Sequence, residues 1–231
     1  MKKFIKIALL LSFMILISSC KKKETEIDFE KSVMTEIFPS LVDSSCVDCR
    51  NIIPPPPFGK AIYDKNGNYV KTDTSNIKLE RENWDRKLEK IKNDTSKKII
   101  AFNPVLNKIE DNIGEDFEKH FSGAKIFEMK TEQNLEYKFD FKNIKLNNKF
   151  VLKDISEFPK ERGQIWRTKY DFVFLGVVSF SRIQFDGNKK FGVLNGGFVC
   201  GKYYGQEFRI YIKKVDNKWI IDKIERQTWI S

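Results

Sequence analysis

Two cysteines that are close together in the sequence are among the residues that could form a reactive or metal-binding site. Cys46 and Cys49 form a Cys-x-x-Cys motif, and Cys200 lies far downstream. Such a pair can form a disulfide, exchange thiols or contribute to a zinc site. Zinc would need two further ligands, and apart from Cys20 the chain offers only Cys200 and His120, so no metal site is expected. We predict a Cys46–Cys49 disulfide with Cys200 buried and free. A bond from Cys200 to one of the pair, and a catalytic dithiol, are the alternatives.

The fourth cysteine, Cys20, stands where an apolar run stops and a lysine cluster begins. Three lysines precede the apolar run at 7–17, and two serines follow it. This order describes a secretory signal peptide, and the run is shorter than the roughly 20 apolar residues that a spanning helix needs. The end of the run, Ile17-Ser18-Ser19-Cys20, resembles the bacterial lipobox, in which the cysteine thiol is acylated and the chain is cut before it. We predict a signal peptide at 1–19, a lipidated Cys20 carrying acyl chains such as palmitate, and a tether at 20–27. Alternatively, Cys20 ends a plain signal peptide.

The charge of the chain fits a membrane surface better than nucleic acid. The formal charge is +10, and three of the lysines lie in the predicted signal peptide, which leaves about +7. Lys21, Lys22 and Lys23 are the tight basic cluster beside Cys20, where they would contact anionic headgroups. The other basic residues are interspersed with acids, without an RNA- or DNA-binding motif, so no nucleic-acid partner is expected. Because lysine and not aspartate follows Cys20, the pattern resembles the sorting signal for the outer membrane.

Two further places carry candidate functional side chains. Ser179, Ser181 and Arg182 lie within the stretch VSFSRIQF, where small polar residues and an arginine in a strand could form a ligand-binding floor. The alternative is that they occupy the solvated face of an ordinary strand. His120 is the sole histidine and is expected to be a surface or packed residue, not a base. No motif for a cofactor, a phosphate or a nucleophilic serine is present. Carboxylates far apart in sequence could still form a hydrolase site.

Hydrophobic periodicity predicts which elements position these residues. A four-residue period predicts helices near 28–41, 75–93 and 113–121, and Asn66-Gly67 predicts a hairpin turn. A proline-rich loop at 44–59 follows the first helix. Strands are predicted from apolar alternation and turn residues at 97–102, 135–141, 150–152, 172–185, 191–200, 208–215 and 219–224. These elements predict an α+β domain at 28–231, in which N-terminal helices precede a continuous antiparallel β-meander.

Several stretches resemble a known group of proteins. The lipobox, the loop IFPSLVDSSCVDCRNIIPPPPFG with YDKNGN, the strand FSRIQF and the ending NKWIIDKIERQTWIS resemble uncharacterised lipoproteins of Bacteroidetes-type bacteria. This resemblance implies an envelope lipoprotein and brings no activity or catalytic residue with it. The ending KWIIDKIE is also similar to the last strand of NTF2-like domains, in which helices pack into a curved sheet around a pocket.

The combined prediction is a lipid-anchored protein of the cell envelope, on the outer membrane. Its partners are membrane lipid, through Cys20, and a protein or small-molecule ligand. A non-enzymatic binding or structural module is the first hypothesis, with no cofactor. An envelope hydrolase and a thiol-redox lipoprotein that uses Cys46 and Cys49 are the alternatives.

Overall fold

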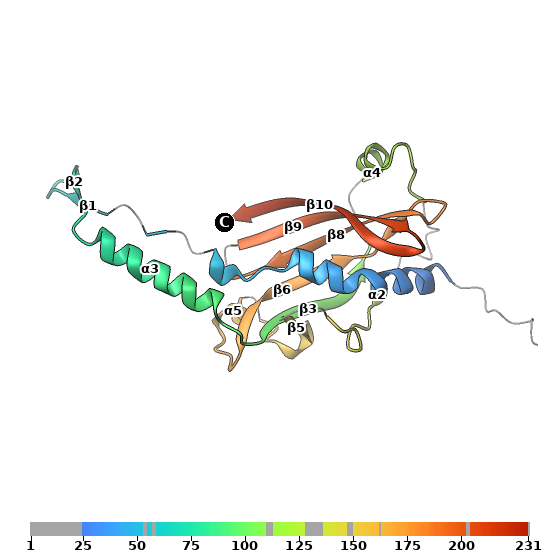
Figure 1. The fold of residues 1–231 in the computed structure, drawn as a ribbon, viewed down its shortest axis with the longest axis horizontal. Coiled ribbons are helices and arrows are strands. Elements are labelled where there is room, and N and C mark those ends of the chain that lie inside the picture. Colours follow the sequence, from blue (N-terminus) through green and yellow to red (C-terminus); the bar gives the residue numbers. More distant parts are fainter. Residues whose placement is uncertain are drawn as a thin grey trace, which may run out of the picture.

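The computed structural model of this chain is built around one large mixed sheet (Figure 1). The structure describes residues 25–52, 55–56, 59–109, 113–127, 136–146, 150–161, 163–201 and 204–230, without the side chains of 227–230. Within these ranges the sheet has eight strands in the order β10-β9-β8-β6-β3-β4, with β5 beside β3 and β7 beside β8. The strands are β3 (Lys98–Asn107), β4 (Tyr137–Lys138), β5 (Phe150–Asp154), β6 (Val173–Ser181), β7 (Gln184–Phe185), β8 (Phe191–Val199), β9 (Tyr204–Val215) and β10 (Lys218–Ile230). The α+β class is therefore as predicted.

The C-terminal strands form the expected antiparallel meander. Strands β6, β8, β9 and β10 pair antiparallel in succession. The β9–β10 connection is the two-residue turn Asp216-Asn217, in which φ is 48° and 63°. Positive φ at both central residues is the geometry of tight hairpin turns, and Asp and Asn tolerate it better than most residues do.

The first half of the sheet does not follow the predicted pattern. Strand β3 runs parallel to both β5 and β6 and lies between them, so the prediction of a wholly antiparallel meander is wrong. Strands β5 and β6 lie on either side of β3, and the connection between them is a crossover that contains η3 (Ile155–Glu157) and α5 (Gln164–Arg167). Helix α4 (Gly114–His120) also lies between strands, so the helices are not all N-terminal.

Helix α2 (Glu26–Ser45) covers one face of the sheet (Figure 1). Thr25 caps it, accepting a hydrogen bond from the Asp28 amide at 3.1 Å. Its buried side chains join the main core together with side chains of β3, β6, β8 and β9. Pro39 does not end the helix, because Phe38 and Leu41 on either side of it are buried against the sheet.

Helix α3 (Ile77–Lys92) and the hairpin of β1 (Lys60–Tyr63) and β2 (Tyr69–Asp73) project beyond the sheet (Figure 1). The hairpin and its turn are as predicted, with the Gly67 amide donating to the Asp64 carbonyl. The helix predicted near 75–93 is present, and its side chains Ile77, Trp84, Leu88 and Ile91 are half-buried, while none of its residues is fully buried. Just after the C-terminal end of α3, Asp94 forms an ion pair at 2.7 Å with Arg50 of η1 (Cys49–Asn51).

The sheet face opposite α2 is covered only at its two ends within the described part of the chain. At one end Phe117 of α4 packs with Val193 and Tyr211. At the other end Phe158, which follows η3, packs with Ile99 and Ala101 of β3. The middle of this face lies between these two small apolar clusters, and most of the side chains that line it are polar.

Candidate functional site

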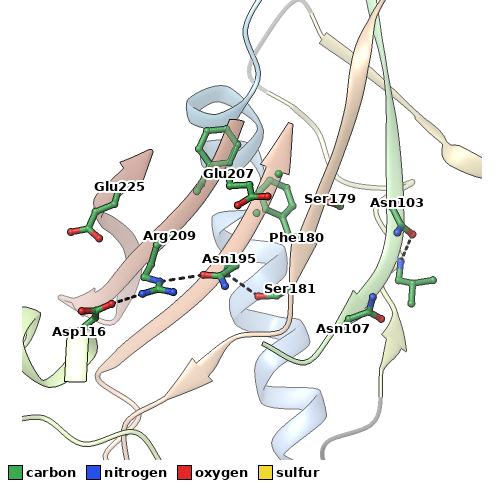
Figure 2. Close-up of a pocket in the computed structure, with 14 residues that line it drawn as sticks. Asn103, Asn107, Asp116, Ser179, Phe180, Ser181, Asn195, Glu207, Arg209 and Glu225 are labelled. Carbon is green, nitrogen blue, oxygen red and sulfur yellow. Dashed lines mark hydrogen bonds and ion pairs between the residues drawn. The ribbon is translucent and has the colours of Figure 1, made fainter. Parts of the chain in front are cut away.

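A polar trough crosses the middle of the sheet face that α2 does not cover (Figure 2). Alternation along each strand creates it, because neighbouring side chains point to opposite faces. One rung across the sheet is Asn103, Ser179, Gly197 and Glu207, which are paired in this order from β3 to β9. Their sequence neighbours Phe102, Val178, Phe198 and Phe208 lie in the core on the other face. The same strands thus provide both the apolar core and the polar surface.

The trough forms an open cavity of about 680 Å³. This volume lies within the range of about 300–1,000 Å³ that is usual for small-molecule sites. The polar lining consists of Asn103, Asn107, Asp116, Ser179, Ser181, Asn195, Glu207, Arg209 and Glu225. Amides, hydroxyls and carboxylates dominate this set, so it suits a ligand that donates and accepts many hydrogen bonds.

A hydrogen-bond network holds one side of the trough in place (Figure 2). Arg209 makes an ion pair with Asp116 of α4, and its Nε lies 3.5 Å from Asn195 Oδ1. The backbone N–H of Asn195 donates to Ser181 Oγ at 2.9 Å, and this hydroxyl donates to the Arg182 carbonyl at 2.8 Å. The network therefore links α4, β9, β8 and β6, and it fixes where these polar groups face the cavity.

The carboxylates Glu207 and Glu225 project from neighbouring strands on the trough face. Glu225 pairs across the hairpin with Arg209, and Glu207 lies two residues before Arg209. A hydrogen bond from Lys223 at 2.7 Å lowers the pKa of Glu225. A general acid needs a raised pKa, so Glu225 is suited to remain an ionised binding group.

Two adjacent glycines in β8 face opposite sides of the sheet. A Cβ on Gly196 would lie 2.7 Å from the Phe180 ring, so the core packs too closely there for any side chain. A Cβ on Gly197 would have no neighbour closer than 3.8 Å. The fold would accept a side chain at Gly197, and its absence keeps the centre of the trough open.

The predicted ligand face is divided by the structure. Ser179 and Ser181 line the trough, whereas Arg182 is buried on the α2 side, where it bonds Glu30 at 2.6 Å. Glu30 also accepts a hydrogen bond from the Ile183 amide at 2.9 Å. Burial raises the pKa of Glu30, and the Arg182 guanidinium opposes this effect. Arg182 thus fastens α2 to the end of β6.

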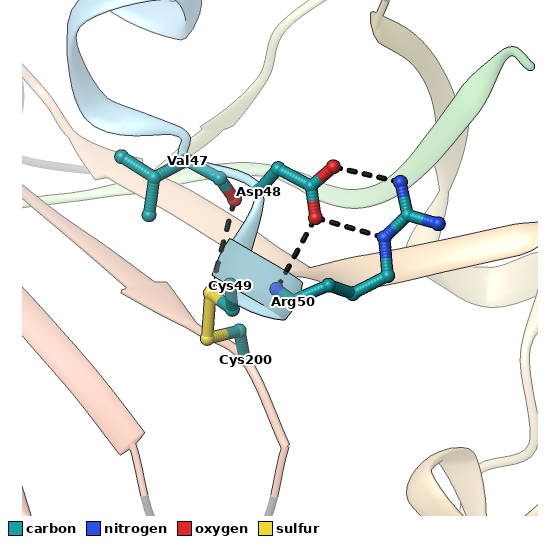
Figure 3. Close-up of a disulfide and its surroundings, with 5 residues drawn as sticks. All are labelled: Val47, Asp48, Cys49, Arg50 and Cys200. Carbon is teal, nitrogen blue, oxygen red and sulfur yellow. Dashed lines mark hydrogen bonds and ion pairs between the residues drawn. A yellow bond between two sulfur atoms is a disulfide. The ribbon is translucent and has the colours of Figure 1, made fainter. Parts of the chain in front are cut away.

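The predicted Cys46–Cys49 disulfide is wrong. Cys49 is bonded to Cys200 (Figure 3), and among the described residues Cys46 is a buried free cysteine. Cys46 follows the last turn of α2 and belongs to the core, while Cys49 lies in η1 beside the end of β8. Burial raises the pKa of the Cys46 thiol, so it is not an activated nucleophile.

His120 packs outside the trough lining. Its ring stacks on Tyr211 at 4.1 Å between centroids, and its Nε2 lies 2.8 Å from Asp222. It therefore braces α4 against β9 and β10. Among the described residues no group of His, Cys, Asp or Glu is arranged to hold a metal ion.

The predicted anchor lies outside the described residues. This applies to the signal peptide at 1–19, to Cys20 and to the lysine cluster at 21–23. In the part that the structure describes, no helix is both long and apolar enough to cross a membrane.

Sequence reasoning missed most of the trough. Four of its polar residues each stand directly beside an apolar residue of the same strand, and this alternation was the available signal: Asn103, Asn195, Glu207 and Arg209. Asp116 comes from a different element, so its place beside Arg209 depends on how α4 packs. No protein-family model, curated protein or solved structure matches this chain.

Proposed function

We propose that this chain is a lipid-anchored protein of the cell envelope whose domain binds a small polar ligand in the trough. The observation that carries the binding proposal is the open centre of a polar cavity at Gly197, where the fold has space for a side chain. The network from Asp116 to Ser181 supports it, because fixed polar groups bind a ligand with less loss of conformational freedom.

Filling the trough tests the binding proposal. Gly197→Leu would place a side chain over the rung between Ser179 and Glu207. The purified protein and this variant are screened against polar metabolites and envelope sugars by ligand-observed NMR, with Gly187→Leu in the β7–β8 turn as the control. The proposal expects ligands that bind the wild type and the control and that Gly197→Leu loses. A screen in which every bound ligand is indifferent to Gly197→Leu would contradict it.

The anchor proposal is supported by the order of the signal-like segment, Cys20 and the lysine cluster in the sequence. The mass of the protein isolated from native membranes tests it directly. A chain that starts at Cys20 and carries a lipid-sized mass increment is expected, and Cys20→Ala should abolish that increment. Separation of inner and outer membranes then tests the predicted outer-membrane location. An unlipidated mature chain would contradict the anchor.

Hydrolysis is the alternative role for the same trough. Glu207 and Glu225 on adjacent strands are its supporting feature, but the lowered pKa of Glu225 favours binding over acid catalysis. The thiol-redox alternative has less support, since Cys49 is bonded to Cys200 and Cys46 is buried.

We also propose membership of the envelope-lipoprotein family and an NTF2-like fold. The antiparallel strands β6 to β10, with α2 packed on them, support an NTF2-like sheet, while the parallel strands β3 and β5 depart from the predicted meander.

A further inference from the structure

The charge of the trough contrasts with that of the whole chain. Among the described residues that line it are three carboxylates, Asp116, Glu207 and Glu225, and one cation, Arg209. The full chain, in contrast, has a formal charge of +10. A basic protein with an acidic cavity would attract cations to that cavity and repel anions from it.

The existing ion pairs leave one of these carboxylates available. Asp116 is paired with Arg209, and Glu225 is hydrogen-bonded to Lys223. Glu207 is exposed and has no hydrogen-bond or ion-pair partner among the described side chains. It lies on the same rung as Ser179, and only Gly197 separates the two. A carboxylate and a hydroxyl therefore flank the open centre of the cavity.

We propose that the trough selects a ligand carrying a protonated amine among hydroxyl or amide groups, and that Glu207 binds the amine. This inference rests on the proposed binding function and specifies its ligand class. An ammonium group has three N–H donors and no acceptor, so it suits a site whose nearest groups are the acceptors of Glu207 and Ser179. The neutral amides of Asn103 and Asn195 can then bond the hydroxyl or amide groups beside the amine. Amino sugars and the amino termini of peptides both present this chemistry.

The test compares probes that differ at one nitrogen, which is a protonated amine in one member of each pair and a neutral acetamide in the other; the Glu207 variant then separates the effect of charge from that of the added acetyl group. One pair is D-glucosamine and N-acetyl-D-glucosamine, and the other is L-alanyl-L-alaninamide and its N-acetyl derivative. NMR titrations of the purified protein are made at slightly acid pH, where both amines are protonated. In at least one pair the ammonium member should bind about three- to tenfold more tightly than the neutral member, as expected for a hydrogen-bonded charge pair. The pair that shows the preference distinguishes a sugar from a peptide source.

The variant Glu207→Gln keeps the size of the side chain and removes its charge. It should abolish the preference for the ammonium member. Glu80→Gln, on the exposed surface of α3, is the matched control and should keep the preference. High salt should weaken only the ammonium member.

Three outcomes would overturn the inference. The first is equal or tighter binding of the neutral members, and the second is a preference that survives in Glu207→Gln. The third is the absence of binding by all four probes. The proposed function is judged separately: ligands from the wider screen that are lost in Gly197→Leu would uphold the trough as a binding site even if the amine inference fails.

Discussion

The two faces of the large sheet are formed by the same strands, but one face packs in the main core and the other forms the polar trough. On the α2 face, Phe102, Val178 and Phe208 are buried in the main core. Their sequence neighbours Asn103, Ser179 and Glu207 lie on the other face. Each residue step along a strand changes the face, so a polar site can be built without interrupting the core. Substitutions on the α2 face should therefore change stability, and those on the trough face should change binding.

The largest expected effect concerns the buried ion pair on the α2 face. Glu30→Ala leaves Arg182 buried without its carboxylate partner, which should lower the free energy of unfolding by about 3–5 kcal/mol. Chemical denaturation measures this value. Glu26→Ala is the matched control on the same helix, because Glu26 makes a partly exposed pair with Lys189 at 3.0 Å. The control should lose at most about 1 kcal/mol. Similar losses in both variants would mean that burial of the Glu30 pair is unimportant.

The next effect comes from the disulfide that ties the segment after α2 to the end of β8. Replacing both Cys49 and Cys200 by serine should lower the free energy of unfolding by about 2–5 kcal/mol, because the bond closes a loop of 151 residues in the unfolded chain. The control is Cys46→Ala, which removes a thiol without breaking a covalent link.

Peptide mapping of the unreduced protein provides a direct check of this pairing. It should recover a peptide joining Cys49 to Cys200, and alkylation should modify Cys46 only after denaturation. A peptide pair joining Cys46 to another cysteine would refute the assignment.

A smaller and sharper contrast is available at the two glycines of β8. Gly196→Ala places a methyl group against the Phe180 ring and should destabilise the protein by about 1–3 kcal/mol. Gly197→Ala makes only ordinary contacts at 3.8 Å and should be neutral or stabilising by up to about 1 kcal/mol, since glycine weakens a strand. Thermal unfolding of the two variants compares the faces at adjacent positions. Equal effects would show that the two faces do not differ in packing.

The sequence predicted the local features of this fold better than its long-range contacts. Helix α2, the Asn66-Gly67 hairpin and the C-terminal meander follow from periodicity and turn residues, which act over a few positions. The parallel pairing of β3 with β5 and β6 depends on which distant strands meet, and no local pattern encodes that. The cysteines show the same limit. Cys46 and Cys49 are close in sequence, yet the packing of α2 buries Cys46 and directs Cys49 toward Cys200.

The candidate site was predictable to a similar extent. Ser179 and Ser181 could be proposed because they stand in an obvious strand, but the side to which Arg182 points depends on the break between β6 and β7 and on its partner Glu30. A binding role for Glu207 and Arg209 can be recognised only when their cross-strand partners in β8 are known. The lining of the trough comes from six elements, so the site can be recognised only when the arrangement of those elements is known.

The smallest expected effect is electrostatic and lies where α4 meets the sheet. The ammonium of Lys213, and after it the ring of His120, lower the pKa of Asp222. A carboxyl whose pKa is depressed in the folded state contributes stability above its ordinary pKa near 4, and this contribution is lost as the pH falls through the folded value.

Asp222→Asn removes the titrating group, so the stability of this variant should decline less than that of the wild type below about pH 4. At neutral pH the variant should lose no more than about 1 kcal/mol, because the three side chains are partly exposed. Thermal unfolding across the acid range measures both effects, with Asp216→Asn in the exposed β9–β10 turn as the control. A variant whose acid decline matches that of the wild type would place the acid sensitivity of the fold elsewhere than at this contact.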